Sequence, residues 1–195
     1  REFRWSWNVS KGPLAGTVVV EFGNLIAAPY AGMLLADLGA RVIKVEPPSG
    51  DLGRQFGPYQ NGESAFFLAV NRGKESLALD PKDWISKRVL DNLVRKADVV
   101  LSNLRHGAME RLGLGEERCH QLNPTLVYAV VSAFGSSGPY ADRAGIDVIF
   151  QGESGMISIT GGPKDGPSKT ATTIGDYMAG TNTALAIVAA LAEQP

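Results

Sequence analysis

The sequence predicts an α/β protein with a doubly wound, mainly parallel sheet and flanking helices. The first observation is a β-branched run over residues 17–22, the pattern of a strand buried on both faces. The second is an apolar helical pattern over residues 27–38, with Pro29 in its first turn and Gly39 just past its end. The third is another strand pattern over residues 41–46. Strand, helix and strand within about 30 residues predict a βαβ unit, which implies parallel pairing and a right-handed crossover.

The same alternation continues along the chain. The predicted elements that follow are a loop over 51–63, a short helix over 66–70, a strand over 76–80, an amphipathic helix over 83–96, strands over 98–102 and 126–132 with two short helices between them, a loop over 134–144, a helix over 147–156, a loop over 161–170 and a last helix from Asp176. This order is typical of a Rossmann-like fold. We expect residues 1–12 to form an N-terminal arm and residues 13–195 to form the globular part.

The composition excludes several classes of function. The chain has 195 residues, 44% of them hydrophobic, and a net charge of −1, so it can bury a core and has no basic excess for nucleic acid. Cys119 is the only cysteine, which excludes an internal disulfide and favours a reducing, cytoplasmic location. With only His106 and His120 besides, a zinc site lacks ligands. No apolar run reaches the roughly 18 residues of a membrane span.

Asp176 is the leading candidate for chemistry. It stands between a polar stretch rich in Gly, Pro and Lys and a long apolar helix. The positive end of the helix dipole at that boundary favours the ionised carboxylate. Such a group can cap the helix through its backbone N–H groups, or it can attack an electrophile.

A nicotinamide-binding domain is the first alternative. Glu46 ends the second strand about 23 residues after Gly23, which imitates the acidic residue of a dinucleotide fingerprint. The turn that follows Gly23 contains none of the further glycines that let a pyrophosphate approach the backbone. The sequence therefore argues against NAD binding.

Short motifs run through nearly the whole chain in a fixed order. They are Pro13-Leu14-Ala15-Gly16, Ala27-Ala28-Pro29-Tyr30-Ala31, the run from Asp37 to Glu46, Asn71-Arg72-Gly73-Lys74 with Leu77-Ala78-Leu79-Asp80, Ala97-Asp98-Val99-Val100 with Asn103, Glu110-Arg111-Leu112-Gly113-Leu114, Asn123-Pro124, Phe134-Gly135 with Gly138-Pro139, and Ile174-Gly175-Asp176. In this order and spacing they resemble family III CoA-transferases, the family of formyl-CoA transferase and the carnitine CoA-transferases.

The resemblance implies that Asp176 is a nucleophile. Its carboxylate would attack an acyl-CoA thioester to give a mixed anhydride and CoA thiolate. Exchange through an aspartyl-CoA thioester would then pass CoA to another carboxylic acid. Covalent catalysis of this kind divides one difficult exchange into easier steps. The partners implied are an acyl-CoA and a small carboxylic acid, with CoA as substrate and no permanently bound cofactor.

The same superfamily contains 2-methylacyl-CoA racemases, which are a second alternative. They carry a proton-transferring His in a Gly-His-Asp triplet, and here the triplet reads Gly145-Ile146-Asp147. Because isoleucine cannot carry a proton, the transferase is preferred. Ile26 stands where formyl-CoA transferase has a glutamine, which favours a more apolar acyl group, and Pro47 replaces a basic residue that often follows the strand-two acid.

The positions that the resemblance assigns to CoA contacts lie where predicted strands end. They are Ile26, Ala27, Leu79, Lys82, Asn103, Leu104, Arg105 and Arg111. Ligands of open α/β sheets bind at these carboxyl ends, and the basic side chains among them can hold phosphates.

The resemblance also implies that the C-terminal half of the family's domain is absent from this sequence. Full-length members are interlocked homodimers, so a homodimer is expected of the full-length protein, in the cytoplasm or, in a eukaryote, in mitochondria or peroxisomes. The remaining alternative is a truncated, non-catalytic CoA-binding module.

Overall fold

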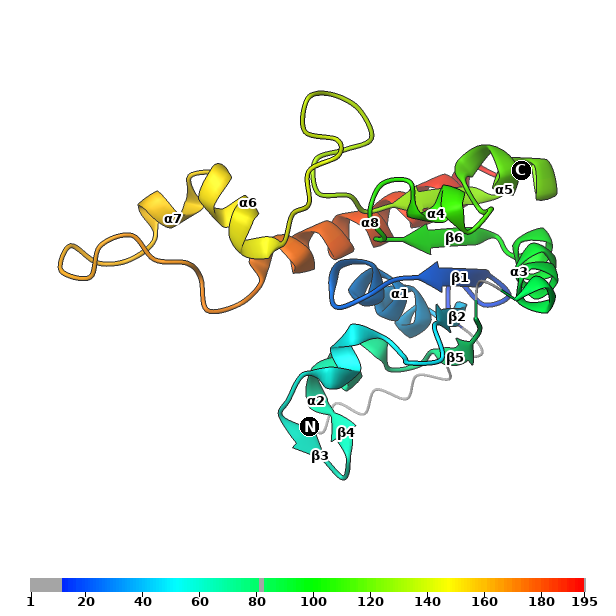
Figure 1. The fold of residues 1–195 in the computed structure, drawn as a ribbon, viewed down its shortest axis with the longest axis horizontal. Helices are drawn as coiled ribbons and strands as arrows, with labels where there is room; N and C mark the ends of the chain where they lie inside the picture. Colours follow the sequence, from blue (N-terminus) through cyan, green and yellow to red (C-terminus); the bar gives the residue numbers. More distant parts are fainter. Residues whose placement is uncertain (1–11, 81–82, 195) are drawn as a thin grey trace, which may run out of the picture.

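The structure, a computed structural model, describes residues 12–80 and 83–194. The expected N-terminal arm lies outside these residues except for Gly12, and so does Lys82. A five-stranded, wholly parallel sheet forms the centre (Figure 1). Its strands are β1 (Val18–Phe22), β2 (Arg41–Glu46), β5 (Glu75–Ala78), β6 (Val99–Ser102) and β7 (Val127–Val130).

The strands lie in the order β5-β2-β1-β6-β7. The chain builds outward from β1 in one direction through β2 and β5, and then in the other direction through β6 and β7. The order therefore reverses between β1 and β6, and this is the place where doubly wound sheets bind ligands beyond the carboxyl ends of their strands. The predicted α/β fold with a doubly wound parallel sheet is confirmed.

Helices cover both faces of the sheet. The helices of the described chain are α1 (Ala27–Asp37), α2 (Ala65–Asn71), α3 (Trp84–Lys96), α4 (Ala108–Arg111), α5 (Glu116–Leu122), α6 (Asp147–Glu153), α7 (Met156–Ile159) and α8 (Ile174–Glu193). One face packs against α1 and α8, and the other packs against α3, α4 and α5. Successive residues of β1 alternate between the faces, so Val19 joins the first core and Val20 the second.

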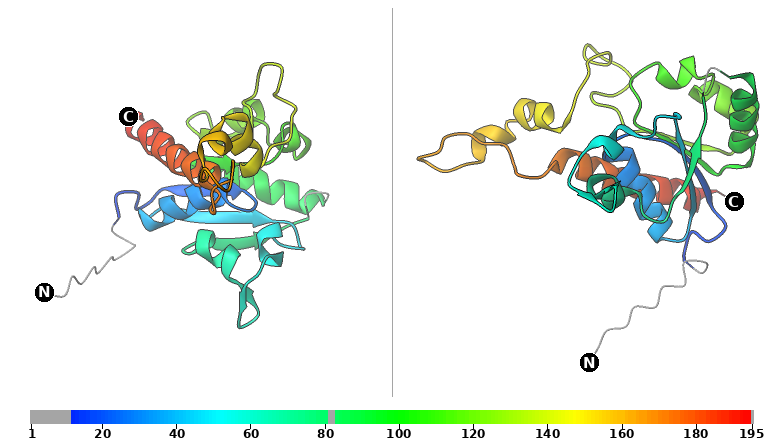
Figure 2. Two further views of the ribbon diagram at one scale, coloured as in Figure 1. Left: turned by 90° about the vertical axis from the view of Figure 1, so that its left-hand side faces the viewer. Right: turned by 60° about the horizontal axis from the view of Figure 1, so that its bottom comes forward.

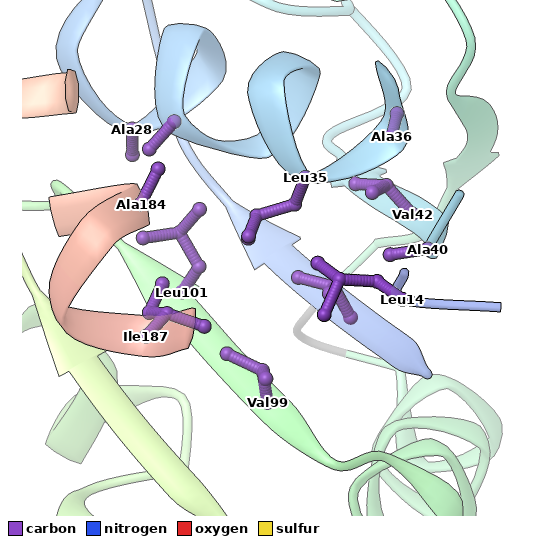
Figure 3. Packing of buried hydrophobic residues seen from close by; sticks show 12 residues of the cluster. Leu14, Ala28, Leu35, Ala36, Ala40, Val42, Val99, Leu101, Ala184 and Ile187 are labelled. Atoms are coloured by element: carbon purple, nitrogen blue, oxygen red, sulfur yellow. The ribbon is translucent and has the colours of Figure 1, made fainter. Parts of the chain in front are cut away.

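The core between the sheet, α1 and α8 contains many alanines (Figure 3). Ala28 of α1 faces Ala184 of α8, and Leu35, Leu101 and Ile187 fill the space between the helices and the sheet. Each fully buried Leu or Ile contributes about 1.5–3 kcal/mol of stability. Alanines at the contact let α8 approach α1 closely, and this places the start of α8 beside the start of α1.

Three predictions differ from the structure in detail. The expected loop over 51–63 contains a 3-10 turn, η2 (Leu52–Gln55), and a small hairpin of β3 (Tyr59–Gln60) and β4 (Glu63–Ser64). The expected helix over 147–156 ends early, because Gly155 adopts a left-handed conformation (φ 80°) before α7. The last helix begins at Ile174, two residues before Asp176.

The segment with α6 and α7 projects from the sheet. Figure 1 shows it beyond the edge toward which the arrows of β1 and β6 point, and Figure 2 shows the same projection from two other directions. The chain returns from this projection into the start of α8. The start of α8 therefore lies at the carboxyl edge of the sheet.

Candidate active site at the start of helix α8

Asp176 is the third residue of α8. Thr173 is the N-cap, and its side chain makes no capping hydrogen bond. Asp176 is therefore not the helix cap; it lies in the first turn, where backbone N–H groups lack partners within the helix. Its side chain is partly buried. A carboxylate at this position is partly exposed and has the N–H groups of the helix end beside it.

The expectation that this position favours the ionised form of Asp176 is wrong in direction. Burial and, as the smaller cause, the negative charge of Asp147 together raise the pKa of Asp176 to about 6. Loss of water around the carboxylate and a neighbouring like charge outweigh the helix dipole. Asp176 is thus a stronger base than an ordinary aspartate, yet about nine in ten molecules are ionised at pH 7.

Asp147 and Gln151 of α6 hold the segment that leads into Asp176. Both side chains are buried. The backbone N–H of Gly175 donates to Asp147 Oδ1 at 2.7 Å. Gln151 Nε2 donates to Asp147 Oδ2, and Gln151 Oε1 accepts from the backbone N–H of Thr170 at 2.8 Å. These bonds connect α6 to both ends of the 170–175 segment. The bond from Gly175 to Asp147 also caps the start of α8, which the side chain of Thr173 does not do.

Close packing joins the start of α8 to the start of α1. A Cβ atom on Gly180 would lie 2.6 Å from the carbonyl oxygen of Ala27 and 3.0 Å from the ring of Tyr30. Tyr30 and Tyr177 meet edge to face, with ring centroids 4.8 Å apart. Since Asp176 and Gly180 are four residues apart, they share one face of α8. Asp176 thus lies on the helix face that meets the beginning of α1.

The beginning of α1 carries Ile26 and Ala27, two of the predicted CoA contacts. Ile26 is the N-cap residue of α1, and both residues are buried, 5% and 6% exposed. Asn103, a third predicted contact, follows β6 and makes two hydrogen bonds of 2.9 Å to the backbone of Asn24. Leu104 follows it and is partly buried. The structure therefore brings these four predicted residues together at the point where strand order reverses.

The other predicted contacts lie further apart. Leu79 follows β5, at the far edge of the sheet. Arg105 is exposed after Asn103, and the neighbouring His106 is exposed as well. Arg111, on α4, lines a cavity of about 300 Å³ between α3, α4 and α5, together with Lys87 and Arg118.

The described part of the chain holds no group of three or more His, Cys, Asp or Glu side chains arranged to bind a metal ion. Among the same residues, no helix has both the length and the apolar character needed to cross a membrane.

Comparison with known proteins identifies the family. Residues 14–195 match the profile of CoA-transferase family III. The chain is 43% identical to succinate–glutarate CoA-transferase of Agrobacterium fabrum over 93% of its own length, and 41% identical to acetyl-CoA:oxalate CoA-transferase of Acetobacter aceti, also over 93%. A crystal structure of a CAIB/BAIF family protein from Brucella suis superposes with a TM-score of 0.88 at 40% identity, covering 92% of this chain. The chain belongs to CoA-transferase family III.

The chain spans about half the length of these relatives. It covers 47% of each of the two enzymes and 49% of the Brucella suis chain. The match covers nearly all of this chain, as the resemblance in the sequence predicted.

Two sets of polar residues beside the site were not predicted. Asp147 entered the sequence argument only through the Gly145-Ile146-Asp147 triplet, and Gln151 did not enter it. A buried group of charges behind the β1–α1 turn was also missed. Its signal in the sequence is a charged residue inside each of two strands predicted to be buried, Glu21 in β1 and Lys44 in β2.

Proposed function

We propose that the full-length protein moves CoA from an acyl-CoA thioester to a free carboxylic acid, with Asp176 as the nucleophile. Membership of CoA-transferase family III supports the reaction class. The observation that carries the assignment of Asp176 is its place in the first turn of α8, packed through Gly180 against the start of α1. There it lies near Ile26 and Ala27 at the start of α1, which follow the turn that Asn103 binds through Asn24.

The reaction begins with attack by Asp176 on the thioester carbonyl. A bond forms between the carboxylate oxygen and the acyl carbon, and the C–S bond breaks to release CoA thiolate and leave a mixed anhydride. The thiolate then attacks the aspartyl carbonyl, releasing the first acid as its carboxylate and forming aspartyl-CoA. The acceptor carboxylate repeats the two steps in reverse, so that a new acyl-CoA leaves and Asp176 is regenerated. No water and no cofactor is consumed.

The raised pKa suits the first step. A carboxylate with a pKa of about 6 is more basic than one at 3.8, the ordinary value, and attacks a carbonyl more readily. It is still charged at neutral pH. N–H groups at the start of a helix, as in α8 and α1, can stabilise the oxyanion that forms during attack. Partial burial limits access of water, which would hydrolyse the anhydride.

Ile146 supports a transferase over a racemase. It is the N-cap residue of α6, directly before the buried Asp147, and its side chain is 60% exposed. An aliphatic side chain cannot supply the second acid or base that racemisation at an α-carbon needs. The proposed chemistry requires only one carboxylate.

The names of the relatives indicate which substrates to assay first. Succinyl-CoA with glutarate and acetyl-CoA with oxalate follow from the two enzymes compared above. The expectation of a more apolar acyl group, based on Ile26, stays a prediction. We place the protein in a reducing compartment, as a homodimer in its full-length form, on the strength of its single cysteine and the family resemblance.

The test uses the full-length gene product and intact-protein mass spectrometry. Incubation with an accepted acyl-CoA should add the mass of CoA less one water, located on the peptide with Asp176. Asp176→Ala should give no adduct and no exchange while still binding CoA. Exchange at the wild-type rate by this variant would refute the assignment, and CoA binding without any adduct in the wild type would favour a binding module.

A further inference from the structure

A buried group of four charged side chains lies behind the β1–α1 turn. We call Glu21, Lys44, Asp51 and Lys74 the ionic cluster. Their side chains are at most 2% exposed. Lys44 Nζ lies 2.9 Å from Glu21 Oε1 and 2.8 Å from Asp51 Oδ2, and Lys74 Nζ lies 2.7 Å from Glu21 Oε2. Two carboxylates and two ammonium groups thus neutralise one another within the protein.

Burying these charges is costly, and other features of the fold accommodate them. Burial lowers the pKa of Lys74 to about 8 despite the nearby carboxylate of Glu21. Gly32 of α1 provides the space for Glu21, because a Cβ atom there would lie 2.1 Å from Glu21 Oε2. A buried ion pair is weak evidence for stability, since apolar residues of similar size often stabilise a fold as well. The ionic cluster therefore calls for a role other than stability.

The ionic cluster reaches the backbone of the turn directly. Lys44 Nζ donates to the carbonyl of Gly23 at 2.7 Å, and the N–H of Leu25 donates to Asp51 Oδ1 at 3.2 Å. Asn103 holds the residue between them through its two hydrogen bonds to Asn24. Every residue of the turn over 23–25 is thus held by a side chain from another part of the chain.

The turn needs this support because Leu25 has a left-handed backbone (φ 63°). A residue with a Cβ atom adopts that conformation only where its surroundings impose it. Lys74 extends the support to the helix that follows, donating to the carbonyl of Pro29 in the first turn of α1 at 2.7 Å. The ionic cluster and Asn103 together fix the path of the chain from the end of β1 into α1.

We propose that the ionic cluster positions acyl-CoA: it holds the turn over 23–25 and the first turn of α1 in the conformation that receives the thioester beside Asp176. The proposal rests on the proposed function, because it assigns the turn to CoA. Glu21, Lys44, Asp51 and Lys74 are positioning residues, which act through the backbone of the turn and do not touch the substrate.

The test is Asp51→Asn in the full-length gene product. The substituted side chain keeps an oxygen to accept from Leu25 and from Gly53, which donates to Asp51 Oδ1 at 2.7 Å. It replaces the oxygen that faces Lys44 with an amide that repels the ammonium group. Lys44 then loses one of its two carboxylate partners, which weakens the hydrogen bond by which it holds the carbonyl of Gly23. If the receptive conformation falls to about a tenth of the molecules, the dissociation constant for CoA, measured by calorimetry, rises about tenfold.

Rescue by glycine separates positioning from mere stability. Leu25→Gly removes the steric cost of the left-handed conformation, so the double variant should recover most of the lost affinity for CoA. The matched control is Glu75→Gln, which makes the same chemical change in an exposed ion pair with Arg41. This pair lies at the amino ends of β2 and β5, the edge of the sheet away from the turn. It should leave the dissociation constant unchanged.

Four outcomes overturn the proposal or its basis. If Asp51→Asn lowers the midpoint of thermal unfolding but binds CoA like the wild type, the ionic cluster is structural only. If glycine at position 25 recovers no affinity, the effect does not pass through the turn. If Asp51→Asn fails to fold, Asn103→Ala tests the support of the same turn from its other side. Its lower affinity for CoA should also be restored by Leu25→Gly. If that affinity is not restored, Asn103 contacts CoA directly and does not act through the turn. Failure of the wild type to bind CoA defeats the proposed function itself.

Discussion

The carboxylate of Asp147 lies 2.7 Å from the backbone nitrogen of Gly175, so a side chain from α6 closes the start of the helix that carries Asp176. The same carboxylate raises the pKa of Asp176 through its negative charge. One residue therefore has two effects on its neighbour, one geometric and one electrostatic. Substitutions can separate them.

Asp147→Asn should remove the negative charge and keep the hydrogen bond to Gly175, while the bond from Gln151 is lost. The amide oxygen can still accept from Gly175, but the negative charge is gone, so the pKa of Asp176 falls. Because the proposed attack requires the ionised form of Asp176, we expect the exchange rate to rise as pH increases through that pKa. The acid limb of the rate profile should therefore move to lower pH than the wild-type limb near 6. An unmoved limb would mean that Asp147 does not influence the titration of Asp176.

Asp147→Ala should remove both effects. Gly175 and Gln151 lose their acceptor, and the 170–175 segment no longer has a fixed connection to α6. Misplacement of a reacting group by about 1 Å can cost roughly 100-fold in rate, so kcat should fall at every pH and far more than in Asp147→Asn. Equal rates in the two variants, measured with the same acyl-CoA and acid, would show that the hydrogen bond to Gly175 does not matter.

Asp176→Asn should stabilise the fold, and more so as pH rises. The folded-state pKa of Asp176 is about 6, above its ordinary value of 3.8. Between these values the folded chain binds the proton more tightly than the unfolded chain, so ionisation lowers the stability of the wild type as pH rises through about 6. Asparagine has no such dependence. The difference in unfolding midpoint should be small near pH 4 and reach its full size above pH 7; a difference that stays constant over that range contradicts the raised pKa.

Cys119 should react with thiol reagents only when the protein unfolds. Its side chain is fully buried, and burial raises the pKa of the thiol to about 11. Its Sγ donates to the carbonyl of Leu114 at 3.3 Å, so the thiol is a structural part of the core between the sheet and α5. Labelling by a maleimide should be negligible in buffer and complete in denaturant. Rapid labelling of the folded protein would mean that α5 opens locally.

The sheet was predictable because its evidence is local. Val-rich runs, helical periodicity and the Gly and Pro residues between them define β1, α1 and β2 within one or two residues. The end of the helix predicted over 147–156 was less predictable, because a Gly in a helix interior and a Gly in a left-handed conformation look the same in a sequence.

The candidate site was predictable only in part. Asp176 stood out because of its place between a polar stretch and an apolar helix. The contacts of Asp147 with Gly175, and of Lys44 with Gly23, join residues 28 and 21 positions apart through folds of the chain that periodicity does not describe. The direction of the pKa shift of Asp176 depends on burial and on Asp147, which the sequence does not place beside it. Local patterns therefore single out Asp176 as a candidate, whereas its environment requires the tertiary structure.

Gly180→Ala should move Asp176 on α8 away from the turn over 23–25 and the start of α1. A Cβ atom at this position would lie 2.6 Å from the carbonyl oxygen of Ala27, and backbone cannot move aside as a flexible side chain can. Helix α8 must shift away from α1, which moves Asp176 relative to the turn over 23–25. Overpacking of this kind costs about 1–3 kcal/mol, and for a domain of this size the unfolding midpoint falls by roughly 2–4 °C per kcal/mol.

The matched control for this variant is Gly152→Ala, also in a helix. A Cβ atom there would meet its nearest neighbour, Ile157, at 3.9 Å, which is ordinary contact. Because alanine favours a helix over glycine by about 1 kcal/mol, this variant should be as stable as the wild type or slightly more so. If close packing of α8 on α1 positions Asp176, Gly180→Ala loses exchange activity even at temperatures where it is fully folded, while Gly152→Ala keeps it. Wild-type activity in folded Gly180→Ala would contradict the idea that this packing positions Asp176.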